Sequence, residues 1–80
     1  MVKIDGFDFQ KSTRKNKKYM VKVNNKTVHF GDNRYEHYND KIGLYKNLNH
    51  NDKERRKRYY ARHGKAEKHS PKWFSHKYLW

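Results

Sequence analysis

The sequence contains no cysteine, a single proline and only eight acidic residues. Without cysteine, the chain can form neither a disulfide framework nor a thiolate metal site, which fits a reducing compartment. Apolar residues occur only in very short runs, so no segment is long enough to cross a membrane. The N-terminal residues also lack the apolar stretch of a secretory signal peptide. We therefore expect a soluble protein that is not secreted by that route and has no membrane partner.

Aliphatic side chains are also scarce, and this scarcity limits the core. Only 32% of the 80 residues are hydrophobic, whereas the chain has two Trp, seven Tyr and four Phe. A chain this short forms one domain, residues 1–80, and buries a smaller share of its surface than a larger protein. Aromatic side chains bury more area than valine. They must therefore supply most of the core, with Lys and Arg stems covering its edges.

Positive charge is the most pronounced property of the chain. Twenty-one Lys and Arg residues oppose eight Asp and Glu residues, which gives a formal net charge of +13. Such an excess favours nucleic acid, an anionic membrane surface or an acidic protein as the partner. An AT-rich genome would also raise the lysine and asparagine content together without any functional meaning. Composition therefore indicates classes of partner but no reaction.

Residues 17–30 have the pattern of a β-hairpin. Apolar and polar side chains alternate on both sides of Asn24 and Asn25. Asparagine tolerates positive φ, so this pair suits a tight two-residue turn. The turn would place apolar residues opposite one another on one face of the sheet, as buried sheets require: Val21 with Val28, and Tyr19 with Phe30.

Two other segments contribute to the expected fold. Residues 7–10 alternate between apolar and polar side chains, which favours a third strand. Residues 35–50 combine helical spacing of apolar residues with Gly43 and several asparagines. We expect this second segment to form short helical turns and loop that carry apolar side chains back onto the sheet.

A helix is predicted over residues 51–63. Asn51 is its expected N-cap, and Glu54 three residues later completes the pattern of a capping box. Gly64 follows the last helical residue and is a common helix terminator.

A second helix is predicted over residues 71–79, because Ser70 before Pro71 has the form of an N-cap followed by proline at the first helical position. Its aromatic residues could stack on bases or dock into another protein, but in a chain short of aliphatics we assign them to the core. We expect an α+β domain with a two- or three-stranded antiparallel sheet and both helices packed on one face. The expected core residues are Tyr19, Val21, Val28, Phe30, Leu44, Leu48, Trp73, Phe74 and Leu79.

The first helix carries the densest basic cluster. Like charges four residues apart destabilise an isolated helix, and an anionic partner would offset that repulsion. The alternative is a solvated helix that docks through Tyr59 or Tyr60, but we favour phosphate binding. We expect at least one of Arg56 and Asp52 to be structural, and the outward-facing residues to be Arg55, Arg58 and Arg62. The candidate helix contacts are Arg55, Arg56, Lys57, Arg58 and Arg62.

A second basic cluster lies in residues 11–18. It is either a phosphate clamp at the edge of the sheet or a charged hairpin end that resists edge-to-edge aggregation. The pattern favours neither interpretation over the other. The candidate loop contacts are Arg14, Lys15, Lys17 and Lys18.

Histidine and aspartate occur close together at His37 with Asp40 and at His50 with Asp52, with His29 and His63 elsewhere in the chain. No spacing matches a defined ligand motif, and six histidines in so short a chain produce such pairs by chance. We therefore expect no metal, no cofactor and no enzymatic activity. A metal-dependent nuclease is the least favoured of the functions that we consider.

Three blocks of sequence occur in order from residue 17 onward: KKYMVKVNNKTVHFGD, HNDKERRKRYYARHG and SPKWFSHKYLW. Together they resemble a family of small, uncharacterised basic proteins encoded by large DNA viruses of algae and protists. The resemblance implies a viral origin and a place in the virion, or in the host cytoplasm or nucleus during infection. It brings no established activity with it.

The function that we expect is non-enzymatic, low-specificity binding of nucleic acid, DNA in preference to RNA, which condenses or positions a viral genome. The alternative is a small structural protein of the virion, a minor capsid or cement protein, whose basic surface meets acidic capsid proteins or other viral proteins.

Overall fold

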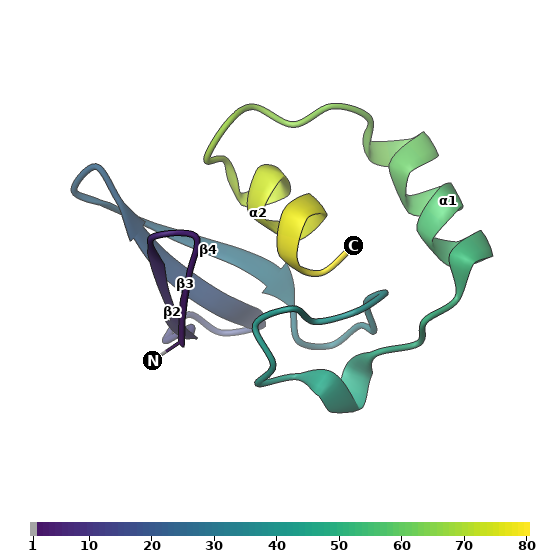
Figure 1. Cartoon of the computed structure of the whole chain (residues 1–80), viewed down its shortest axis with the longest axis horizontal. Helices are drawn as coiled ribbons and strands as arrows, with labels where there is room; N and C mark the ends of the chain where they lie inside the picture. Colours follow the sequence, from purple (N-terminus) through teal and green to yellow (C-terminus); the bar gives the residue numbers. More distant parts are fainter. Residues whose placement is uncertain (1) are drawn as a thin grey trace.

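The computed structural model describes residues 2–80, so Met1, the first residue of the predicted domain, lies outside the described residues. Strands β1 (Val2–Ile4), β2 (Phe7–Lys11), β3 (Lys17–Val23) and β4 (Lys26–Asp32) form one antiparallel sheet in that order. A 3-10 turn, η1 (Lys46–Leu48), and two helices, α1 (Lys53–His63) and α2 (Pro71–Tyr78), follow. Helix α2 lies between the sheet and α1 (Figure 1). The predicted α+β fold is confirmed.

The predicted hairpin is present with its expected register. Asn24 and Asn25 have φ values of 48° and 66°, as a tight turn with two left-handed residues requires. The paired residues of β3 and β4 include Val21 with Val28 and Tyr19 with Phe30. Residues 7–10 are also in a strand, β2, as predicted.

Strand β1 was not predicted, although the sequence contains a signal for it. Asp5 and Gly6 connect β1 to β2 and have φ values of 54° and 83°. Asp-Gly is one of the strongest short signals for a two-residue hairpin turn. Because β1 is only three residues long, its alternation was too short to be recognised.

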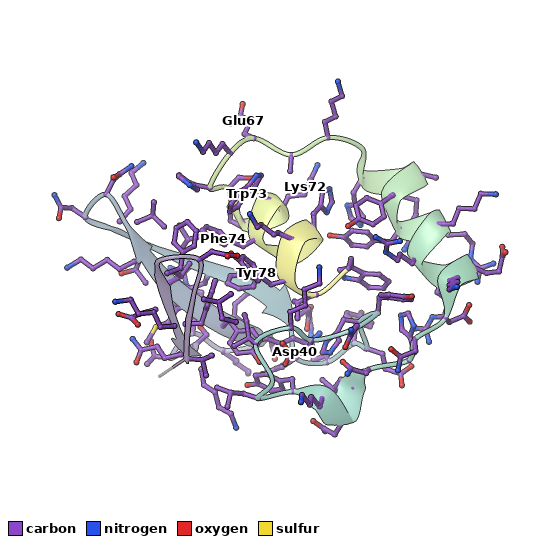
Figure 2. All side chains as sticks on the ribbon, in the orientation of Figure 1. Asp40, Glu67, Lys72, Trp73, Phe74 and Tyr78 are labelled. Atoms are coloured by element: carbon purple, nitrogen blue, oxygen red, sulfur yellow. The ribbon has the colours of Figure 1, made fainter. Side chains whose placement is uncertain are left out.

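The core is built mainly from aromatic side chains on one face of the sheet and on α2. Phe30 stacks on Phe74 with ring centroids 5.4 Å apart, and Phe9 contacts Tyr78 with centroids 4.7 Å apart. In Figure 2, Phe74 and Tyr78 project from α2 toward the strands. The buried apolar residues are Phe9, Tyr19, Val21, Phe30, Ile42, Tyr59, Phe74, Tyr78 and Leu79.

Two leucines of the expected core are not in it. Leu44 is 41% exposed and Leu48 is only partly buried. The predicted short helical turns and loop over residues 35–50 are present, but the only regular turn of this described segment is η1, so helical spacing does not place these two leucines on a common inner face. Ile42 is buried in this segment instead. Val28 and Trp73 are partly buried and pack against the core.

A buried carboxylate holds this loop against the sheet. Asp40 accepts hydrogen bonds from the Tyr19 hydroxyl at 2.5 Å and from the backbone N–H groups of Ile42 and Tyr45 at 2.8 Å each. The Tyr19 hydroxyl in turn accepts from the backbone N–H of Leu44 at 2.9 Å. Burial and the bond to Asp40 raise the pKa of Tyr19 above its ordinary value, so the phenol stays protonated.

The helix ends differ from the prediction at one residue. The N-cap of helix α1 is Asp52 and not the predicted Asn51, so the helix begins one residue later than predicted. The Asp52 side chain accepts from the N–H groups of Glu54 and Arg55 at 3.0 and 3.3 Å, whereas Asn51 has a positive φ of 54°. The expected terminator, Gly64, is confirmed as the C-cap.

Helix α2 has the predicted start. The Ser70 hydroxyl accepts from the N–H of Trp73 at 3.2 Å, and Pro71 is the first helical residue. Helix α2 packs on the sheet, but α1 does not: its contacts are with α2, with Trp80 and, through Arg55 and Arg56, with the loop before it. The expectation that both helices pack on one face of the sheet is therefore right for α2 and wrong for α1.

Removing the Asp40 carboxylate should strongly destabilise the fold. We expect Asp40→Ala to lower the free energy of unfolding by about 2–4 kcal/mol, because it leaves the Tyr19 hydroxyl and the N–H groups of Ile42 and Tyr45 without an acceptor. Urea unfolding followed by circular dichroism measures this loss. Asp8→Ala, at an exposed position of β2, should change stability by less than about 0.5 kcal/mol. Equal effects of the two substitutions would contradict a special role for Asp40.

Candidate nucleic-acid interface

Helix α1 is held in place by aromatic stacking. Tyr59 is its one buried residue, and the Tyr59 ring stacks on Trp80 with centroids 4.2 Å apart and an interplanar angle of 4°. The Tyr60 hydroxyl donates to the carbonyl oxygen of His76 at 2.9 Å. The expected docking through Tyr59 or Tyr60 is thus present for both tyrosines.

Arg56 also holds α1 in place. Its Nε donates to the carbonyl oxygen of Trp80 at 2.6 Å, and its guanidinium lies over the rings of Tyr38 and Tyr60 at 5.1 and 5.4 Å. Together with the capping role of Asp52, these contacts confirm that residues of the basic segment hold the fold. Arg56 therefore has less freedom to meet a partner than the other arginines of α1.

Three other arginines of α1 surround one hollow of the surface. This hollow, called here the arginine hollow, has a volume of about 440 Å³. No Asp or Glu of the described residues lines it. The lining residues are Arg55, Arg58, Ala61, Arg62 and Trp80. The structure therefore brings together the three arginines that the helical spacing had grouped and adds an aromatic side chain from the distant end of the described chain.

Arg55 differs from the other two because it has an acidic partner. Its Nη1 lies 2.9 Å from Oε1 of Glu36, and the two side chains are 41% and 51% exposed. The hydrogen bond from Arg55 lowers the pKa of Glu36 below its ordinary value. An ion pair this exposed contributes little to stability. Arg58 and Arg62 are exposed without such a partner among the described residues, and Lys57 is exposed outside the hollow.

The second basic cluster is divided by the fold. Arg14 and Lys15 are exposed on the turn between β2 and β3 and line neither hollow. Lys17 and Lys18 instead line a second hollow, called here the inner cavity, which has a volume of about 450 Å³. Arg62 of α1 lines it too, so residues of both basic clusters meet there.

Lys18 is not on the exposed surface of the turn. It is 2% exposed, and its side chain lies against Gly31, where a Cβ atom would come within 2.9 Å of Leu79 and 3.1 Å of Lys18. Burial lowers the pKa of Lys18 from 10.5 to about 8, although the carboxylates of Asp32 and Asp40 act in the opposite direction. Sequence alternation placed this lysine on the solvent side of β3, whereas the loop and the C-terminal region cover it.

The histidines form no shared metal site in the part of the chain that the structure describes, where no group of three His, Asp or Glu side chains could hold a metal ion. His37 is buried, and its Nε2 lies 2.6 Å from Oδ1 of Asn49. Burial, followed by the charge of Lys18, lowers the pKa of His37. His37 is thus part of the interior that supports the loop. No helix of residues 2–80 has the length and apolar character needed to cross a membrane.

Three residues near the two hollows were not candidates from the sequence. Trp80 lines both hollows, Lys72 of α2 lines the inner cavity, and Tyr35 lines the same cavity with 65% of its surface exposed. Lys72 extends from α2 on the side of α1 (Figure 2), and its Nζ donates to the carbonyl oxygen of His63 at 3.1 Å. Local sequence patterns do not reveal this placement, because it depends on the packing of α1 against α2.

Comparison with known proteins gives one match. Residues 7–63 match a family of unknown function (DUF5754), which is more than half of the chain. The chain belongs to this family. The DUF5754 match covers strands β2–β4, the loop and α1, and it ends before α2 and Trp80, which hold α1 in place. No curated protein and no solved structure is similar enough to the chain to count as a match.

Replacing the buried Lys18 should stabilise the protein near neutral pH. In the folded state the Lys18 pKa is lowered to about 8 from 10.5, so folding disfavours the protonated form that dominates at pH 7. We expect Lys18→Met, which keeps the apolar stem, to raise the free energy of unfolding by about 1–3 kcal/mol at pH 7. Because the amine is neutral in both states above about pH 10.5, the gain should shrink as the pH rises from 8 to 10.5.

Urea unfolding at several pH values between 7 and 10.5 measures this difference. Lys22→Met, at an exposed position of the same strand, is the matched control and should show no such pH dependence. A Lys18→Met variant that is less stable than the parent at pH 7 would contradict the expectation.

Proposed function

We propose that the protein is a non-enzymatic, low-specificity nucleic-acid-binding protein that condenses or positions the genome of a large DNA virus. It would act in the virion, or in the cytoplasm or nucleus of the infected cell. DNA is the preferred partner. The proposal unites the sequence resemblance to proteins of such viruses with the surface around α1.

The single observation that carries the proposal is the arginine hollow. Arg58 and Arg62 stand beside Trp80 with no acidic residue of the described chain in its lining. Arginine and lysine side chains bind phosphates and release the counterions condensed on nucleic acid, which gives affinity without base specificity. Trp80, which lines the same hollow and is partly exposed, offers an aromatic contact to sugars or bases.

The fold also gives several acidic residues partners of their own, so that they do not pair with Arg58 or Arg62. Asp32 is bonded to Arg34, and Glu36 is bonded to Arg55. Asp40 is buried, and Asp52 caps α1. Four of the eight acidic side chains are thus engaged within the fold, which leaves most of the basic side chains without an acidic partner.

An alternative proposal is a structural virion protein that binds acidic surfaces of capsid proteins or other viral proteins. The observation that favours it is the pairing of arginines with a tryptophan in one hollow, since both residue types are enriched at the energetic centres of protein interfaces. Nucleic acid and acidic protein differ in salt dependence, because phosphate contacts give a steep linear fall of log affinity with log salt concentration.

Neutralising two arginines of the hollow should weaken binding to DNA and reduce its salt dependence. We expect Arg58→Ala with Arg62→Ala to lower the slope of log affinity against log salt by about 1.8, since each phosphate contact contributes about 0.9. Mobility shift of a duplex oligonucleotide at several salt concentrations measures the slope.

The matched control is Lys3→Ala with Lys22→Ala, which removes the same charge from exposed positions of β1 and β3. It should leave the slope close to that of the parent. Equal effects of the two double variants would show that net charge, and not the arginine hollow, sets the affinity. No shift of DNA by the parent protein at about 50 mM salt would overturn the proposed function.

Breaking the ion pair of Arg55 should strengthen binding. We expect Glu36→Gln to raise DNA affinity by up to about fivefold, because it releases Arg55 toward the hollow and an exposed pair contributes only about 0.2–1 kcal/mol. The same mobility shift assay measures the change. In the Arg55→Ala background the substitution should have a smaller effect, since the pair no longer exists. Weaker binding by Glu36→Gln alone would contradict the expectation.

A further inference from the structure

The inner cavity combines an apolar interior with a basic rim. Its volume of about 450 Å³ falls in the range of pockets that hold small organic ligands. The apolar part of the wall consists of Phe30 from β4, Tyr59 from α1, and Leu79 and Trp80 from the segment after α2. The cavity thus lies where the sheet, both helices and the last described residues meet.

A buried cation without a partner lies in the wall of this cavity. Lys18 is 2% exposed, and its ammonium group has neither a hydrogen bond nor an ion pair with any of residues 2–80. Lys18 is one of the residues that line the cavity, so its side chain borders the space that a ligand would fill. The carboxylates of Asp32 and Asp40 act on this ammonium only from beyond ion-pair distance, so an anion in the cavity would supply the direct partner that it lacks.

The rim adds further positive charge. Lys17 of β3, Arg62 of α1 and Lys72 of α2 line the cavity from three sides. The two carboxylates in the lining already have partners, because Asp32 accepts from Arg34 at 2.8 Å and Glu36 accepts from Arg55 at 2.9 Å. His63 lies in the same wall. The cavity therefore favours a ligand with negative charge.

The apolar wall restricts the ligand further. A small inorganic anion would leave the aromatic part of the cavity unfilled, whereas an anion attached to a planar group would use both parts. Tyr35 offers an additional surface at the opening, since it is 65% exposed and lines the cavity. Aromatic side chains stack on nucleobases of any sequence.

We propose that the inner cavity binds one nucleoside monophosphate unit, with its phosphate at Lys18 and Lys72 and its base against the apolar wall and Tyr35. The unit is either a free nucleotide or the 5′-phosphorylated end of a single strand. In the second case the site deepens the proposed function, because Arg62 and Trp80 line both the cavity and the arginine hollow, so a strand bound in the hollow can end in the cavity.

Chemical-shift titration of the ¹⁵N-labelled full chain tests the site. The ligands are adenosine monophosphate, adenosine, inorganic phosphate, and a single-stranded oligonucleotide with or without a 5′-phosphate. Adenosine monophosphate should shift the amide signals of Lys18, Gly31 and Leu79. Adenosine and phosphate should each bind more weakly than the nucleotide. If inorganic phosphate binds as tightly as adenosine monophosphate, the base adds no affinity, and its proposed position against the apolar wall is wrong.

The decisive variant is Lys18→Met, which keeps the apolar stem of the side chain. It should weaken binding of the nucleotide about tenfold to a hundredfold, the effect of losing a hydrogen bond to a charged group. Lys22→Met, exposed on the same strand, is the control and should bind as the parent does. Unchanged affinity of Lys18→Met, or no shift at the cavity with the parent protein, would overturn the proposal.

The oligonucleotide arms separate this site from the proposed function. Tighter binding of the 5′-phosphorylated strand, lost in Lys18→Met, would support the strand end as the ligand. Binding of the free nucleotide alone would support a small-molecule site and would count against genome binding. Salt-dependent binding of oligonucleotides without any shift at the cavity would overturn the cavity site and leave the arginine hollow as the interface.

Discussion

The hydrogen bond from the buried Tyr19 hydroxyl to the Asp40 carboxylate connects the sheet to the loop, and the placement of the basic helix depends on that connection. The chain has too few aliphatic residues to anchor the loop over residues 33–50 by apolar contacts alone. Asp40 replaces them by accepting three hydrogen bonds, which give the loop a defined path without a helix. The loop then presents Glu36 to Arg55 and the Tyr38 ring to Arg56, so α1 is positioned partly by the loop.

The distribution of charge also follows from the small number of aliphatic residues. Most of the acidic residues accept hydrogen bonds that shape the fold, whereas most of the basic residues lie at the surface. The five acidic residues with such bonds are Asp5, Asp32, Glu36, Asp40 and Asp52. The positive field around α1 and the inner cavity is therefore a consequence of how the eight acidic residues are used, and not only of their small number.

Elements with local signals were predictable. The hairpin around Asn24 and Asn25 could be assigned with its register, because the turn and the alternation depend on neighbouring residues. The start of α2 followed from Ser70 and Pro71 for the same reason. The loop itself was predicted, but its path was not, since no periodicity describes it and its contacts come from β3 and the C-terminal region. The error at Leu44 arose because helical spacing was extended to this residue, whereas the short turn η1 begins only at Lys46.

In the candidate interface, too, some features could be predicted from the sequence and others depend on tertiary packing. The sequence by itself determined the excess of positive charge, the hairpin, both helices and the grouping of Arg55, Arg58 and Arg62, because each depends on composition or on residues a few positions apart. Only the tertiary structure decided that Arg56 supports the fold, that Lys18 is buried at a cavity and that Trp80 stands among the arginines. The reason is that burial and pairing are set by neighbours many residues away in the chain, which reach these side chains only when the sheet, the loop and α2 have packed together.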